Sequence, residues 1–129
     1  MARLSAALRA VALAALLLPL AAAAQVQAPR LAVDKQHSVG KCPLELRFAP
    51  SVTVAKAPLQ VTYQIVRSDG TSSGPQQAVL AMSGPQQLPA YTWKVVAAQG
   101  TKVAGWAQLE ILLPVKVQSG KESFMVECW

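Results

Sequence analysis

The chain holds 129 residues, with 12 lysines and arginines against 6 acidic residues, so its formal net charge is +6. The basic residues are scattered singly along the sequence, and this argues against a nucleic-acid or lipid-headgroup patch, which needs clustered Lys and Arg. The length fits one small domain rather than several.

The first 24 residues have the pattern of a secretory signal peptide. Two positive charges, Arg3 and Arg9, precede the apolar run Val11 to Leu20, and the small residues Ala22 to Ala24 follow it. The apolar run is shorter than the roughly 20 residues that span a bilayer, although an N-terminal membrane anchor is the alternative. We predict a helical signal peptide over residues 1–24, cleaved before Gln25, with Ala28 as the alternative cleavage site. We also predict export to the periplasm or out of the cell.

The exported part, residues 25–129, then carries ten basic and six acidic residues and two cysteines. An even number of cysteines in an exported chain predicts a disulfide, here between Cys42 and Cys128. Two thiols and the single histidine, His37, do not complete a tetrahedral zinc site, so we expect no metal and no cofactor. The predicted organisation is an N-terminal segment with the first strand (25–41) and a disulfide-closed core (42–129).

The exported part lacks helical periodicity and shows short stretches with a period of two. Gly, Pro and Ser separate these stretches, as in Ser68-Asp69-Gly70 and Ser83-Gly84-Pro85, and such punctuation is typical of turns between strands. We therefore predict an all-β antiparallel sandwich or barrel of about seven strands. The predicted strands are Arg30 to Lys35, Cys42 to Val54, Leu59 to Arg67, Gln76 to Met82, Leu88 to Ala97, Val103 to Leu113 and Ser123 to Cys128.

The phase of the alternation assigns residues to the core. Cys42 is in step with Leu44, Leu46 and Phe48, and Cys128 is in step with Phe124 and Val126, so both thiols should point inward. If consecutive strands run antiparallel, the second strand starts at the pole where the seventh ends. The two thiols would meet there at bridging distance.

The order of several short motifs resembles a group of small exported bacterial domains of uncharacterised function. The group's pattern is a Cys-Pro start, an aromatic residue on a strand, a Ser-Asp-Gly turn, a strand tryptophan and a Phe-x-x-x-Cys finish. This chain matches it at Cys42-Pro43, Val61-Thr62-Tyr63, Arg67-Ser68-Asp69-Gly70, Trp93 and Phe124 to Cys128. The resemblance implies an immunoglobulin-like sandwich with paired terminal cysteines, and it implies no activity. Unlike antibody domains, the chain has no Tyr two residues before its second Cys.

The sequence offers little for catalysis. Asp34, His37 and Ser38 are close in sequence, but triad residues normally come from separate elements and need an oxyanion hole, so we interpret them as a polar linker. Asp69-Gly70 is interpreted as a tight turn rather than a calcium loop, because calcium requires several acidic ligands. We predict that the protein is not an enzyme.

The aromatic residues give the remaining lead to function. Trp93 is in phase with the core, whereas Trp106 is out of phase with Leu109 and Ile111; it is either exposed or turned inward by a bulge at Gly105. The predicted interaction surface therefore combines Trp106 and Gln108 with the loop that contains Arg67 and Asp69.

These observations favour an exported, non-catalytic binding module with an unknown protein or glycan partner, which we expect to be monomeric. Two alternatives remain. A structural subunit of an envelope or surface assembly would oligomerise or exchange strands, and a secreted enzyme inhibitor would present a rigid loop, for which Ser68 to Pro75 is the candidate.

Overall fold

A computed structural model describes residues 25–129, and the predicted signal peptide lies outside these residues. The described part consists of ten strands and contains no helix, and thus no helix that is long and apolar enough to cross a membrane. The strands are β1 (Val26–Val33), β2 (His37–Gly40), β3 (Leu44–Val54), β4 (Leu59–Arg67), β5 (Gln76–Leu80), β6 (Gly84–Gln87), β7 (Tyr91–Val95), β8 (Lys102–Leu113), β9 (Val117–Gln118) and β10 (Glu122–Cys128).

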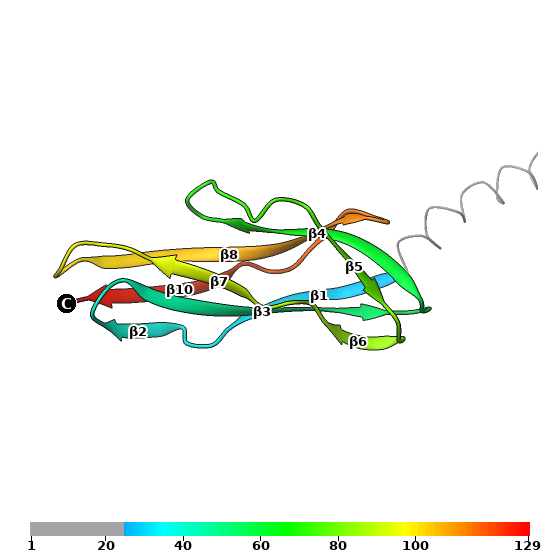
Figure 1. The fold of residues 1–129 in the computed structure, drawn as a ribbon, viewed down its shortest axis with the longest axis horizontal. Coiled ribbons are helices and arrows are strands. Elements are labelled where there is room, and N and C mark those ends of the chain that lie inside the picture. Colours follow the sequence, from blue (N-terminus) through cyan, green and yellow to red (C-terminus); the bar gives the residue numbers. More distant parts are fainter. Residues whose placement is uncertain (1–24) are drawn as a thin grey trace, which may run out of the picture.

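The strands form two sheets that face each other (Figure 1). In the small sheet, β3 lies between β1 on one side and β6 and β7 on the other; the large sheet has the order β2-β10-β8-β4-β5, with β9 also paired to β8. Consecutive long strands β3 and β4 belong to different sheets, and β4, β8 and β10 lie side by side in the large one. This Greek-key order is that of an immunoglobulin-like sandwich, so the predicted fold class is confirmed.

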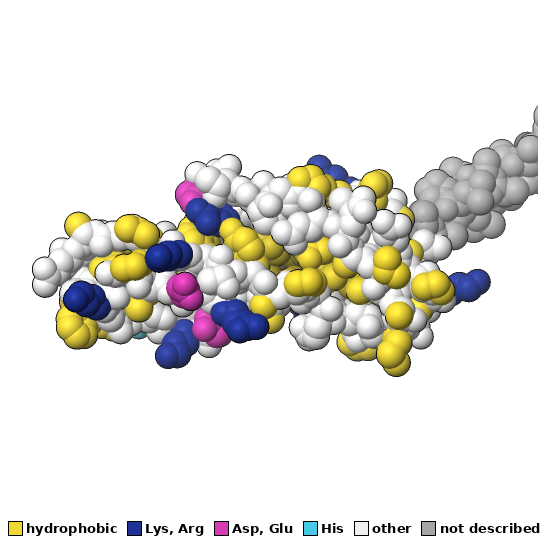
Figure 2. Space-filling model, viewed as in Figure 1, with side chains coloured by type: hydrophobic (Ala, Val, Ile, Leu, Met, Phe, Trp, Pro, Cys, Tyr) yellow, Lys and Arg dark blue, Asp and Glu magenta, His cyan; other side chains and the backbone are white. Residues whose placement is uncertain are grey.

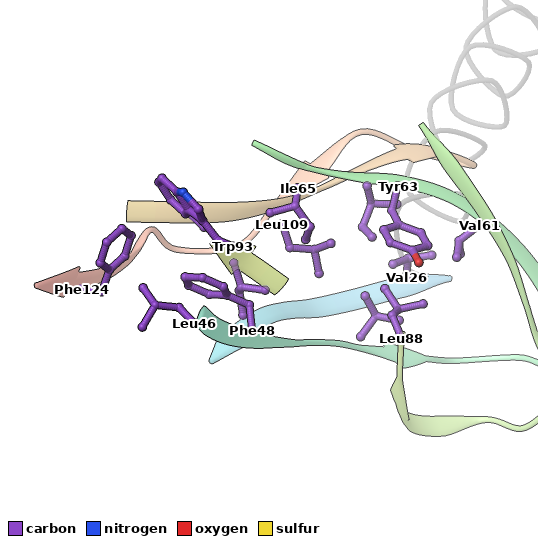
Figure 3. Close-up of a cluster of buried hydrophobic side chains, with 14 of the residues drawn as sticks. Val26, Leu46, Phe48, Val61, Tyr63, Ile65, Leu88, Trp93, Leu109 and Phe124 are labelled. Carbon is purple, nitrogen blue, oxygen red and sulfur yellow. The ribbon is translucent and has the colours of Figure 1, made fainter. Parts of the chain in front are cut away.

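Alternating side chains fill the space between the two sheets (Figure 3). Leu46 and Phe48 of β3, Ile65 of β4 and Leu109 of β8 are at most 1% exposed. Trp93 of β7 is also buried, as its phase predicts, and it packs edge-to-face on Phe124 with ring centroids 4.8 Å apart. Burial of these side chains removes apolar surface from water and is the main force that holds the sheets together.

The predicted disulfide between Cys42 and Cys128 is confirmed. Its Cα atoms are 5.3 Å apart, and the two residues are separated by 86 positions in the sequence. Cys42 precedes β3 in the small sheet and Cys128 ends β10 in the large sheet. The bridge therefore ties the two sheets together at one pole and encloses most of the described chain.

Three short strands were not predicted. The first is β2, which pairs with β10 in parallel and is the exception to an otherwise antiparallel sandwich. The second is β6, which the sequence predicted to be a turn because it begins with Gly84-Pro85. The third is β9, which is only two residues long. Such strands are defined by their neighbours rather than by an alternation of their own. The predicted strand beginning at Leu88 starts instead at Tyr91, although Leu88 is buried.

Candidate functional site

The alternation of β8 decides where Trp106 lies. Ala107 and Leu109 are fully buried on the inner face, so Trp106 and Gln108 lie on the outer face of the large sheet, where both are half-buried. The register between β8 and β10 is regular from residue 102 to residue 107 and has no bulge at Gly105. Of the two alternatives for Trp106, the structure therefore supports a place on the surface.

Gly105 lets the end of β4 approach β8 closely. A Cβ atom at this position would lie 2.8 Å from Ser68 Oγ and 2.9 Å from Phe124 Cζ, so no larger residue fits without displacement. The backbone N–H of Ser68 donates to the carbonyl of Trp106 at 2.9 Å, and the N–H of Trp106 donates to Ser68 Oγ at 3.1 Å. These two hydrogen bonds hold the backbone of Trp106 in place and so fix the start of its side chain.

A shallow, open hollow of about 870 Å³ surrounds Trp106. Its walls include Gln36, Ser68, Lys121, Ser123 and Met125, of which Met125 is 41% exposed. The ammonium of Lys121 lies 4.4 Å from the centroid of the Trp106 ring, a distance typical of a cation–π contact. The hollow therefore combines an aromatic ring and an apolar thioether with a polar rim.

Gln108, the neighbour of Trp106 on this face, has a structural role. Its side-chain amide donates to the carbonyl of Ser119 at 2.7 Å. Ser119 is itself buried, and its hydroxyl accepts from the N–H of Leu109. Gln108 thus holds the turn before β10 against β8.

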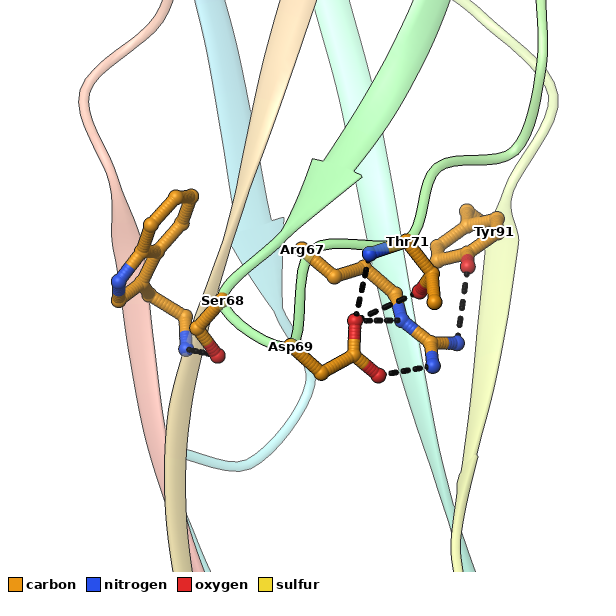
Figure 4. A network of polar contacts seen from close by, with 6 residues as sticks. Arg67, Ser68, Asp69, Thr71 and Tyr91 are labelled. Carbon is orange, nitrogen blue, oxygen red and sulfur yellow. Dashed lines mark hydrogen bonds and ion pairs between the residues drawn. The ribbon is translucent and has the colours of Figure 1, made fainter.

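Arg67 points away from the Trp106 hollow. It lies opposite Ala107 in the register between β4 and β8, so its side chain is on the inner face. The guanidinium lies 4.2 Å from the centroid of the Trp93 ring and donates to Tyr91 Oη at 3.3 Å. Arg67 therefore connects β4 in the large sheet to β7 in the small sheet, as Figure 4 shows.

Asp69 completes this polar group, which we call the Arg67 brace (Arg67, Asp69, Thr71 and Tyr91). Asp69 forms an ion pair with Arg67 and accepts hydrogen bonds from the N–H and the hydroxyl of Thr71. These hydrogen bonds, that from Arg67 first, lower the pKa of Asp69 well below its usual range. The hydrogen bond to Asp69 also raises the pKa of Arg67, although its partial burial acts in the opposite direction.

The turn around Asp69 agrees with the tight turn predicted from the sequence. Gly70 has a φ of +85°, and the Asp69 carboxylate accepts the N–H two residues on. The loop also folds back on β4. The hydroxyl oxygen of Ser73 accepts a hydrogen bond from the N–H of Ile65, and the N–H of Ser73 donates to the carbonyl of Ile65.

The predicted interaction surface is thus divided in the structure. Trp106 and Gln108 share the outer face, whereas Arg67 and Asp69 belong to the brace between the sheets, and Ser68 is the link between the two groups. The sequence reasoning missed Lys121, Met125 and Tyr91. Tyr91 comes from the other sheet, and its closeness to Arg67 follows only from the tertiary fold.

The residues considered for chemistry are engaged elsewhere. Asp34 accepts from the backbone N–H groups of Lys35 and Arg47, and His37 Nε2 lies 3.7 Å from a carboxylate oxygen of Glu127. Within residues 25–129, no group of three or more His, Cys, Asp and Glu side chains is arranged to hold a metal ion.

Fold and site together define a small, disulfide-bonded, immunoglobulin-like sandwich domain. No model of a protein family and no curated protein sequence matches the chain. Among solved structures, the chain is similar to the CARDB domain of a Pyrococcus furiosus protein that was solved in complex with di-metal ions. The TM-score is 0.49 at 12% sequence identity, with 79% of this chain and 94% of the other covered. The likeness concerns the fold alone.

Proposed function

We propose that this protein is an exported, non-catalytic binding module that recognises a protein partner through the hollow around Trp106. The observation that carries the proposal is the position of this tryptophan, which is held by a fixed backbone on an outer sheet face. Tryptophan and methionine are enriched in the centres of protein interfaces, and a rigid aromatic ring loses little entropy on binding.

The disulfide supports export as part of the proposal. Disulfides persist in oxidising compartments such as the periplasm and the cell exterior, and they are rare in the cytosol. The bridge between Cys42 and Cys128 and the predicted signal peptide favour the same compartment. Polar side chains at the rim of the hollow, such as Ser123 and Lys121, would supply directional contacts to the partner.

Site-specific photo-crosslinking in an exporting bacterial host tests this function. A photoreactive amino acid replaces Ser123, which lies opposite Trp106 in the register between β10 and β8. We expect a discrete cross-linked protein from this position, and none from the same amino acid placed at exposed Gln87 on the small sheet. Trp106→Ala should lower the yield by roughly tenfold or more, as for a central interfacial tryptophan.

A second variant guards against a folding defect in the first. Met125→Glu introduces a charge into the same hollow at an exposed position and should also abolish the adduct. Circular dichroism and disulfide content should match those of the unaltered protein for both variants. Equal adducts from positions 123 and 87, or an adduct that survives both substitutions, would refute the proposal. Adducts with glycans only would assign the hollow to a carbohydrate and refute a protein partner.

A further inference from the structure

The strand β5 is an edge strand of the large sheet, and its sequence lacks the protection that edge strands normally carry. It is the last strand in the sheet order and pairs with β4 alone. An edge strand presents unpaired N–H and C=O groups, and proteins usually shield them with charges, proline or bulges. From Gly70 to Trp93 the chain has no charged residue.

The other edges of the sandwich do carry such protection. β1 has a register irregularity between Gln27 and Arg30, with Ala28 at a φ of +46°. β2 is four residues long, and its His37 faces Glu127. In the small sheet, β6 contains Pro85 and β7 contains Lys94. Among the described strands of more than two residues, β5 is therefore the edge without charge, proline or bulge.

The surface over this edge differs from the rest of the same face. In Figure 2, lysine, arginine and acidic side chains gather in the left-hand part, whereas the right-hand part, over β5 and β6, is white and yellow with dark blue only at its margins. Val79 of β5 is 68% exposed, and Gln77 beside it is exposed on the same outer face. The edge of β5 thus presents the apolar side chain of Val79 and the amide of Gln77 beside the outward N–H and C=O groups of the strand.

We propose that β5 pairs with β5 of a second copy of this chain, in antiparallel orientation about Ala78. In this register Gln77 of each copy lies opposite Val79 of the other, which gives two equivalent Gln77–Val79 pairs. The two large sheets become one continuous sheet. Two copies of this edge can pair with each other because the edge is uncharged, so neither copy buries a charge on pairing. Residues 25–129 carry ten basic and six acidic residues, a net charge of +4, so two copies approach each other with the least local charge repulsion at this uncharged edge.

The pairing is short, since β5 has five residues. An interface of this size lies below that of stable complexes, so the dimer should form only at high protein concentration. This proposal departs from the monomer expected from the sequence, and it is independent of the Trp106 hollow.

Two double substitutions test both the surface and the register. Gln77→Lys with Val79→Lys places lysine opposite lysine in both pairs, and Gln77→Glu with Val79→Lys places glutamate opposite lysine. Both positions are exposed, so the fold should be retained. Sedimentation velocity over a concentration series should show dimer formation for the unaltered protein, loss of dimer for the dilysine variant, and restored dimer for the glutamate–lysine variant.

The matched control adds the same two lysines to another exposed segment, as Val96→Lys with Gln99→Lys, and should leave dimer formation unchanged. The processed product from an exporting host is used throughout. An unaltered protein that stays monomeric over the whole series, a dilysine variant that still dimerises, or a glutamate–lysine variant that stays monomeric would each overturn the proposal.

Discussion

At the scale of single residues, the Arg67 brace shows how one side chain joins the two sheets. The guanidinium of Arg67 lies over the Trp93 ring, and its donors reach Tyr91 in the small sheet and Asp69 in the loop after β4. Arginine suits this position because its planar guanidinium stacks on an aromatic ring while it donates several hydrogen bonds at its edge.

The low pKa of Asp69 makes the contribution of the brace dependent on pH. A carboxylate whose pKa is lower in the folded state stabilises the fold above its unfolded pKa of about 4, and this contribution is lost as the pH falls through the folded value. We expect Asp69→Asn to unfold more easily than the unaltered protein at pH 7, with the difference shrinking steadily below about pH 4. Urea unfolding at several pH values measures this.

The effect should be modest, because the Asp69 side chain is 41% exposed and solvent screens the ion pair. Exposed Glu45 on β3 provides the control, and Glu45→Gln should change stability little at pH 7. A stability difference for Asp69→Asn that stays constant down to the lowest pH would contradict the argument.

At the scale of elements, the contact between β4 and β8 depends on the absence of a side chain at Gly105. Gly105→Ala would bring a methyl group against Ser68 Oγ and the ring of Phe124. We expect a loss of about 1–3 kcal/mol in the free energy of unfolding, as for other overpacked sites, measured by chemical denaturation.

Gly120 serves as the control for this substitution, because nothing lies within 4 Å of a Cβ added there. Gly120→Ala should therefore be close to neutral. If Gly105→Ala were as stable as Gly120→Ala, the close approach of Ser68 and Phe124 would not constrain this position.

Strands of five or more residues could be located from the sequence, although β1 begins at Val26 rather than at the predicted Arg30; strands of two to four residues could not. β4 was predicted at its observed bounds because Val61, Tyr63 and Ile65 alternate with polar residues along its whole length. The segment Gly84–Gln87 has the same Gly-Pro-Gln-Gln sequence as residues 74–77, and its first residues predict a turn. It becomes a strand only because β3 extends far enough to pair with it.

The candidate site was predictable in part for a similar reason. The phase of β8 left Trp106 between two alternatives because local alternation does not show which neighbouring strand covers a position. Ser68 reaches the hollow from the end of β4, and Lys121 and Met125 reach it from β10 and the residue before it. Their closeness to Trp106 follows from sheet order rather than from spacing in the sequence.

At the scale of the whole molecule, the disulfide between Cys42 and Cys128 limits the conformations of the unfolded chain. In the chain-entropy account, a loop of this length contributes about 4–5 kcal/mol. For a domain of this size, that is a large share of a typical stability of about 5–15 kcal/mol. We expect the double variant Cys42→Ser and Cys128→Ser to lose about 4 kcal/mol, as judged by thermal and chemical unfolding.

The accompanying control is the unaltered protein unfolded with a reducing agent, which should approach the stability of the double variant. A double variant that unfolds at the same denaturant concentration as the oxidised protein would show that the bridge does not raise the free energy of unfolding.

The same bridge also determines how the domain would respond to a stretching force. A pull applied at Gln25 and Trp129 reaches the two sulfur atoms after residues 25–41 have been drawn out, and the load then passes through a covalent link. At about 3.5 Å per extended residue, the extensible length is roughly 60 Å rather than several hundred. While oxidised, the domain stops extending once β1 and β2 have been drawn out, because the bridge between Cys42 and Cys128 then carries the tension.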